Sequence, residues 1–247
     1  MLQAILHGKA GRFSGHSRQV FRWRSVFKRS EDLLTAVFFG RFPYLSPVGQ
    51  SALVSFMIGR DEDPSSLGDF LDIFFWEKVA RDGSSYVEPD VIIVWEKLVV
   101  IVEIKPPFGG WQYKKQWERE IEGLLSSQEE LNIDPRQRNG IYLVALGKNA
   151  PSWRKDARVL GDRFKEDSVR VNAVEWSDLR HFLDEDKIAL TAADQFVVND
   201  WKEALGVFGI HPKLKDFSEL LSKASLLDSN RALSLIKEIP LPSRDRS

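Results

Sequence analysis

The first third of the chain contains two apolar patterns, one helical and one typical of a strand. In residues 30–42 they recur at helical spacing, as at Leu34 and Phe38. Ser30 stands just before them, and serine often caps the first turn of a helix, so a helix is expected here. Residues 72–79 form a short aromatic run that ends before a turn, which is typical of a strand.

The middle of the chain predicts a hairpin, a helix and two more strands. The runs 91–95 and 99–104 are rich in β-branched residues and are separated by a short break, which favours a hairpin of central strands. Residues 111–125 predict an amphipathic helix, and residues 140–146 and 169–176 predict strands. The expected apolar face of that helix consists of Tyr113, Trp117, Ile121 and Leu124. The order of these elements predicts an α/β fold with a mixed sheet flanked by helices.

The C-terminal part of the chain changes to short helical patterns. Residues 194–209 end at glycines, as helices often do, and residues 216–227 begin with capping-box spacing. We therefore expect a core in residues 30–190, followed by a small helical C-terminal extension in residues 191–247. The stretch before the core, residues 1–29, is expected to form a basic N-terminal arm.

Composition excludes several kinds of chemistry. No apolar run approaches 18 residues, so no membrane span is expected. The chain has no cysteine, which excludes disulfides, thiolate zinc sites and cysteine nucleophiles, and which fits a cytoplasmic protein. The four histidines lie without ligand spacing, and no phosphate-binding glycine loop is present for ATP. Four tryptophans lie at helical or strand spacing, and most of them are expected in the core: Trp111, Trp117, Trp176 and Trp201.

Charge is balanced overall but is unevenly distributed. The net charge of −1 excludes bulk coating of nucleic acid. Residues 1–30 nevertheless carry seven basic residues and, before Ser30, no acid. They could contact phosphates, or they could form a frayed or transit-like segment. Four residues further along could also contact phosphates, although a solvated helix surface would explain the lysines equally well: Lys114, Lys115, Arg136 and Arg138.

Ionisable residues interrupt the predicted hairpin at one end. Glu103 and Lys105 are two residues apart and so project from the same side of their strand. Hairpin pairing would bring Asp90, at the start of the other strand, beside Glu103. Charges beside a core are costly unless they are paired or bind a metal, and oxygen ligands select Mg²⁺ or Mn²⁺. Such a site suits hydrolysis of a phosphodiester. The alternative is that Glu103 and Lys105 form a solvated pair on an edge strand and that Asp90 is a turn residue.

The sequence "EPDVII", followed thirteen residues later by "EIK", resembles the PD-(D/E)xK nuclease superfamily, which includes restriction-endonuclease-like enzymes. That resemblance implies a core of a helix, three strands, a helix and a fourth strand. It covers roughly residues 25 to 215 and is similar in particular to nucleases of prokaryotic restriction and defence systems.

The resemblance also implies roles for individual residues. Asp90 and Glu103 would be metal ligands, together with the carbonyl of Ile104, and Lys105 would be the catalytic lysine. Glu31 on the first helix would be an acid near the metal, although a Glu in a first turn often only complements the helix dipole. A glutamine on the helix after "EIK" would face the site, and the spacing favours Gln112 over Gln116. Glu88 is expected to be a loop charge.

The expected function is therefore a Mg²⁺- or Mn²⁺-dependent DNA endonuclease. The resemblance implies DNA as the substrate, a motor or sensor subunit of a defence complex as a partner, and association into a homodimer. Two alternatives stay open. One is a non-catalytic structural or DNA-docking subunit with the same fold, and the other is an RNase or a nuclease specific for branched or single-stranded DNA.

Overall fold

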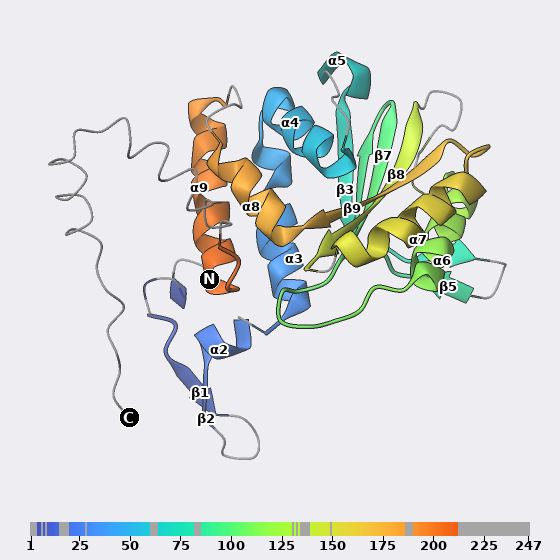
Figure 1. The fold of residues 1–247 in the computed structure, drawn as a ribbon. Coiled ribbons are helices and arrows are strands. Elements are labelled where there is room, and N and C mark those ends of the chain that lie inside the picture. The colour runs from blue at the N-terminus through green and yellow to red at the C-terminus, as the bar shows by residue number, and fades with distance from the viewer. Residues whose placement is uncertain are drawn as a thin grey trace, which may run out of the picture. The chain divides into compact units, whose positions relative to one another are not determined.

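A five-stranded mixed sheet forms the centre of the computed structural model (Figure 1), with strand order β3-β6-β7-β8-β9. The strands are β3 (Phe70–Phe75), β6 (Val91–Trp95), β7 (Leu98–Ile104), β8 (Gly140–Gly147) and β9 (Val169–Glu175). Pairing is antiparallel from β3 to β7 and parallel from β7 to β9. The structure describes residues 4–5, 7, 9–14, 20–27, 29–59, 64–81, 85–129, 131, 133, 139–148, 150–185 and 190–211.

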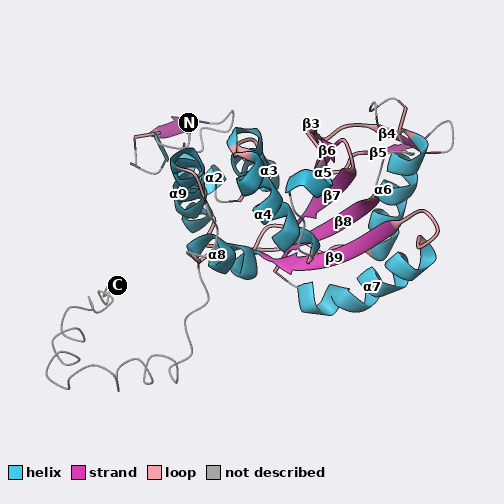
Figure 2. Cartoon of the chain, turned by 90° about the horizontal axis from the view of Figure 1, so that it is seen from above, coloured by secondary structure: helices cyan, strands magenta, loops and turns pink. Residues whose placement is uncertain are grey.

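Helices cover both faces of this sheet (Figure 2). One face is covered by α6 (Lys114–Ser126) and α7 (Ala150–Arg163). The other face is covered by α3 (Glu31–Phe39), α4 (Pro47–Ile58), α8 (Trp176–Asp184) and α9 (Ala192–Val207). Because both faces are covered, every residue of β6, β7 and β8 is buried, which explains their continuous apolar runs.

Smaller elements surround the central layers. They are β1 (Arg12–Ser14), β2 (Val20–Arg22), α2 (Trp23–Phe27), the 3-10 helix η1 (Phe42–Tyr44), α5 (Pro64–Leu67), β4 (Val79–Arg81) and β5 (Ser85–Val87). The β4–β5 hairpin packs against α6 at Gly123. A Cβ atom at Gly123 would lie 2.8 Å from a methyl carbon of both Val79 and Val87, so this close approach requires glycine.

Aromatic residues join the terminal segments to the core. Phe38 of α3 stacks on Trp201 of α9 with ring centroids 4.4 Å apart, and the Trp201 indole donates to the Phe38 carbonyl at 2.7 Å. Phe27 of α2 is buried against Phe208, with ring centroids 5.4 Å apart. Both α2 and α9 therefore contribute to the core within the compact unit Met1–Pro212. The boundaries expected near residues 29 and 190 stay predictions.

The predicted fold class is confirmed. The mixed sheet is flanked by helices, and the order α3, β3, β6, β7, α6, β8 contains the helix, three strands, helix and fourth strand that the resemblance implies. The hairpin of 91–95 and 99–104 is present as β6 and β7. Two core helices, α4 and α7, were not predicted.

Several details of the sequence interpretation are wrong. The strand in 72–79 ends at Phe75, and Trp176 begins α8 instead of ending β9. The tryptophan prediction is confirmed, because most of the four are in the core: Trp117, Trp176 and Trp201 are buried, and Trp111 is 66% exposed. Tyr113 is 64% exposed and precedes α6, because the helix begins at Lys114.

Some predictions concern residues outside the described part of the chain. These are the helix in residues 216–227, the tail after it, and the phosphate contacts of Arg136 and Arg138. Within the described residues, no helix combines the length and apolar character needed to cross a membrane.

Candidate active site

The β6–β7 hairpin brings Asp90 and Glu103 together, as the sequence predicts. Val91 pairs with Val102, so Asp90 and Glu103 are next in register at the same end of the hairpin. The Asp90 Oδ2 atom accepts a hydrogen bond from the Ile104 amide at 2.7 Å. The backbone of Asp90 is also held, because its carbonyl accepts from the Trp76 amide at 3.3 Å.

Lys105 links two acids that are far apart in the sequence. Its Nζ atom donates to Glu103 Oε1 at 2.8 Å and to Glu31 Oε1 at 2.9 Å. Glu31 is the first residue of α3, so this contact joins the helix N-terminus to the end of β7. The structure thus brings together all three residues of the predicted motif and the acid predicted on the first helix.

The strand that carries Glu103 and Lys105 lies in the centre of the sheet. β7 pairs with β6 on one side and with β8 on the other, which contradicts the alternative of a solvated pair on an edge strand. Ile104 points into the opposite apolar layer, as alternation along a strand requires. Glu88 is exposed in the loop before β6, where it was expected.

The structure places Gln116, and not Gln112, against the carboxylates. Gln116 lies in the first turn of α6, and its Nε2 atom donates to Glu103 Oε1 at 2.6 Å. Gln112 precedes the helix, and its Nε2 atom donates to the Glu103 carbonyl at 2.9 Å. The Trp117 indole donates to the Oε1 atom of Gln112. Both ends of the Gln112 amide are therefore bonded, and Gln112 anchors the loop before α6. Gln116 therefore contacts the Glu103 carboxylate and Gln112 the Glu103 backbone, and the functional role of Gln112 stays a prediction.

Glu120 is a member of the cluster that the sequence interpretation missed. It lies one turn after Gln116 on α6, and 1% of it is exposed. Its carboxyl group interacts with that of Glu103. Among the described residues, Glu120 Oε2 is a buried side-chain oxygen without a hydrogen-bond partner. A signal for Glu120 was present, since it falls within the apolar stripe of Trp117, Ile121 and Leu124.

Burial and mutual repulsion raise the pKa values of the three buried acids. The pKa of Asp90 is raised to about 8 by burial and by the nearby Glu103 carboxylate, although the Ile104 amide opposes the shift. Burial also raises the pKa of Glu103, against the effect of Lys105. Burial and Glu103 raise the pKa of Glu120. The acids of the cluster therefore ionise less readily than ordinary carboxyl groups.

Lys105 stays protonated within this cluster. Burial alone would lower its pKa, but the carboxylates of Glu103 and Glu31 outweigh burial and raise the pKa. Lys105 therefore supplies one positive charge among several acids.

The donor chemistry of the cluster fits a hard divalent cation. Asp90 and Glu103 offer carboxylate oxygens, and a cation would relieve the repulsion that raises their pKa values. As the side chains lie, no group of three or more His, Asp or Glu residues within the described ranges is arranged to hold a metal ion. Two carboxylates, with backbone and water oxygens completing the shell, suit Mg²⁺.

A cavity borders the cluster at the carboxyl ends of the strands. The Trp176 indole, in its wall, donates to the Lys105 carbonyl at 2.9 Å, which ties the cavity to the motif. The lining residues are Pro107, Lys148, Glu175, Trp176, Ser177, Gly209, Ile210 and His211.

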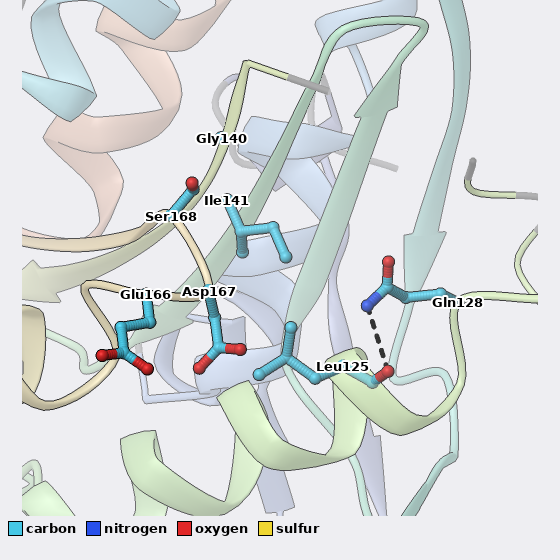
Figure 3. A pocket seen from close by; sticks show the side chains of 7 residues that line it. All are labelled: Leu125, Gln128, Gly140, Ile141, Glu166, Asp167 and Ser168. Atoms are coloured by element: carbon cyan, nitrogen blue, oxygen red, sulfur yellow. Dashed lines mark hydrogen bonds between the residues drawn. The ribbon is translucent and has the colours of Figure 1, made fainter. Parts of the chain in front are cut away.

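A second cavity lies at the opposite end of the sheet (Figure 3). It is formed where α6 ends and where β8 and β9 begin, and Gln128 Nε2 donates to the Leu125 carbonyl beside it at 3.0 Å. Gly140 in its wall pairs with Leu98, the first residue of β7, whereas Glu103 lies near the last residue. This cavity is therefore separate from the acid cluster. Its lining residues are Leu125, Gln128, Gly140, Ile141, Glu166, Asp167 and Ser168.

Comparison with known proteins gives a distant likeness to a solved structure. No family model matches the chain. Among solved structures, the chain is similar to the small subunit (R.BspD6I2) of the heterodimeric restriction endonuclease R.BspD6I, with 17% sequence identity and a TM-score of 0.26. That alignment covers 76% of this chain and 96% of the other.

Proposed function

We propose that this protein is a metal-dependent DNA endonuclease that hydrolyses phosphodiester bonds at the cluster of Asp90, Glu103 and Lys105. The observation that carries the proposal is the convergence of two buried carboxyl groups and the partly buried Lys105 at one end of the β6–β7 hairpin. Burying charges in this way is unfavourable for stability, so a chemical use for them is the better explanation.

Each residue has a role that follows from its position. Asp90 and Glu103 would hold Mg²⁺ or Mn²⁺, with the Ile104 carbonyl as a further ligand. When bound, the cation would supply charge neutralisation at the phosphate and a bound water of lowered pKa. Lys105 would stabilise negative charge on the phosphate, while Glu31 fixes the position of its ammonium group. Gln116 would hold Glu103 in a single orientation.

The biological setting in this proposal comes from the sequence resemblance. It is that of a cytoplasmic nuclease component of a prokaryotic anti-phage or restriction-type system, with DNA as the substrate. The same resemblance supports a motor or sensor subunit as a partner and a homodimer as the active form.

Cleavage of defined substrates tests the proposal. Purified protein is incubated with plasmid DNA, linear duplex DNA, single-stranded DNA and RNA in the presence of Mg²⁺ or Mn²⁺. Wild-type protein should cut DNA, and EDTA should abolish the cutting. The Lys105→Ala variant should lose roughly a hundredfold or more in rate, because one group that stabilises the transition state is worth about that much.

A matched control separates chemistry from general charge effects. Lys97 lies in the turn at the other end of the same hairpin, so Lys97→Ala removes one positive charge without touching the cluster. This variant should cut at the wild-type rate. Equal rates for wild type and Lys105→Ala would contradict the proposal. Cleavage of RNA and of no DNA substrate would show that the substrate is RNA.

A further inference from the structure

The loop between β7 and α6 exposes three aromatic side chains beside Lys105. In this loop, residues 106–113, the exposed fractions are 47% for Phe108, 66% for Trp111 and 64% for Tyr113. Figure 1 shows the loop as a long green connection that extends beyond the carboxyl end of β7. Three large aromatic groups within six residues form an exposed apolar patch of the kind that marks a binding site.

The loop is anchored, so these aromatic groups are held close to the cluster. At its end, the buried Gln112 side chain donates to the Glu103 carbonyl at 2.9 Å. Gly110 has a φ of 104°, and a Cβ atom there would lie 2.9 Å from the Lys105 side chain. Glycine at this position therefore allows the loop backbone to pass directly against Lys105.

Trp111 and Tyr113 project away from the core for a structural reason. Gln112 stands between them and points inward, and Tyr113 has an extended backbone with φ −122° and ψ 130°. Side chains alternate sides along an extended chain, so Trp111 and Tyr113 point outward together. Nothing among the described contacts of the fold requires these two rings to be aromatic.

Positive charge lies directly beside the two rings. α6 begins with Lys114 and Lys115 and has no acid in its first turn. Lysine at a helix N-terminus is unfavourable for the helix because it adds to the positive end of the dipole. The combination of exposed rings and adjacent lysines is complementary to a nucleic acid strand, whose bases stack and whose phosphates are negative.

We infer that this loop, with Lys114 and Lys115, is a stacking platform for unpaired bases next to the scissile phosphate. The inference rests on the proposed nuclease function for the reaction itself, and it specifies the substrate as single-stranded or locally unpaired DNA. Bases within a duplex already stack on each other and do not offer a free face to Trp111 or Tyr113, whereas unpaired bases do.

Binding without cleavage tests this inference separately from catalysis. In EDTA, fluorescence anisotropy gives the dissociation constants of a labelled single-stranded oligonucleotide and of the duplex of the same sequence. The double variant Trp111→Ala/Tyr113→Ala should bind the single strand roughly 5- to 150-fold more weakly for each stacked base that it loses. Its affinity for the duplex should change by less than about threefold.

Two further variants distinguish stacking from other effects. The Trp111→Phe variant retains an aromatic ring and should restore much of the single-strand affinity. The Phe196→Ala variant removes an aromatic side chain that is 76% exposed on α9, away from α6 (Figure 2), and should bind like wild type. Circular dichroism melting curves confirm that all variants are folded.

The outcomes for the two proposals are distinguishable. Unchanged single-strand binding in the double variant, or an equal loss for single strand and duplex, would overturn the platform and would favour a protein partner for this patch. If single-strand binding depends on Trp111 but no substrate is cut with any divalent cation, the nuclease proposal fails and the platform stands. If wild type cuts DNA and the double variant cuts single strands equally well, the platform fails and the nuclease stands.

Discussion

Two regions of the molecule bury carboxyl groups, and the pKa values of these groups shift in opposite directions. Asp194 is fully buried where α4 and α9 begin, and it accepts hydrogen bonds at 2.6 to 2.9 Å from the backbone and hydroxyl groups of Ser46 and Thr191. Burial raises its pKa, but these donors outweigh burial, so the pKa is lowered. At the end of β7, by contrast, Asp90, Glu103 and Glu120 face one another, and their pKa values are raised.

The difference separates a carboxylate whose charge is fully paired from a cluster of carboxyl groups that repel one another. Asp194 is satisfied as an anion by four donors and joins the N-termini of two helices, so its charge stabilises the fold. The cluster has one ammonium group, that of Lys105, for several acids, and one oxygen of Glu120 has no hydrogen-bond partner among the described residues. The cluster therefore has more acids than basic groups to pair with them, whereas Asp194 is fully paired.

The largest expected effect comes from removing one ligand of the proposed cation. Glu103→Gln should lower the rate of DNA cleavage roughly a hundredfold or more, because it removes a carboxylate that would hold the cation and that also contacts Lys105. Initial rates on plasmid DNA measure this. Asp194→Asn, assayed at a temperature where it is folded, should cut at the wild-type rate. A comparable loss of rate in both variants would mean that the two carboxylates do not differ in function.

The second effect concerns stability, and here the Asp194 variant should show the larger loss. Asp194→Asn should lower the free energy of unfolding by about 2–4 kcal/mol, because it replaces an anion that accepts several hydrogen bonds. Urea unfolding followed by circular dichroism at pH 7 measures the change. Glu31→Gln provides a half-exposed acid in a first turn for comparison and should cost less than about 1 kcal/mol. A smaller loss for Asp194→Asn than for Glu31→Gln would refute the structural role.

The third effect is the pH dependence of stability, which should have opposite signs in the two regions. Asp90 has a pKa of about 8 in the folded protein against an ordinary value of 3.8, so the folded state holds its proton more tightly than the unfolded chain. Its contribution to stability therefore falls as pH rises through this range. Asp194 has a lowered pKa, so its contribution is present above its ordinary pKa and is lost in acid.

Unfolding free energies at about pH 5 and about pH 8.5 test this sign. Asp90→Asn should raise stability at the higher pH by on the order of 1–3 kcal/mol and should reduce the difference between the two pH values. Asp194→Asn should leave that difference unchanged. A wild-type protein whose stability rises over this range, with no effect of Asp90→Asn on the slope, would show that Asp90 is ionised in the folded state.

The smallest expected effect concerns Glu120. Its carboxyl group contacts Glu103 and not the Lys105 ammonium. Glu120→Gln should therefore weaken Mn²⁺ binding by about tenfold, the usual effect of removing a group that orients a metal ligand. The change should be visible in a calorimetric titration. Glu122→Gln, two residues along the same helix, should bind Mn²⁺ like wild type, since Glu122 pairs with Arg163 instead. Equal affinities in all three proteins would exclude Glu120 from the site.

The sequence predicts the centre of the site because its geometry is local. Alternation along a strand places Glu103 and Lys105 on one side, and hairpin pairing places Asp90 beside them. Glu120 was missed because an acid beside the apolar positions Trp117, Ile121 and Leu124 can equally lie at the solvated edge of the apolar face. Only the docking of α6 on the sheet shows that Glu120 faces inward. The choice between Gln112 and Gln116 likewise depends on where α6 begins.

The helices show the same limit. α3 was predicted because Ser30 caps an amphipathic pattern, and the structure shows that cap, with Ser30 accepting from Leu33. α4 was missed because it packs against other core elements on several sides. Its buried residues are therefore spread around the helix and do not form one apolar stripe in the sequence. The spacing of Trp111 in the sequence does not show its exposure, which depends on the path of the loop that Gly110 and Gln112 fix.

Calorimetric titration with Mn²⁺ at pH 7.5 tests most directly whether the acid cluster binds a hard cation. Wild-type protein should bind Mn²⁺ and should release protons as it does so, which titrations in buffers of different ionisation enthalpy detect. Asp90→Asn and Glu103→Gln should each lose this binding, and Asp194→Asn should keep it. Absence of Mn²⁺ binding by folded wild-type protein, or binding that survives in both cluster variants, would contradict the account.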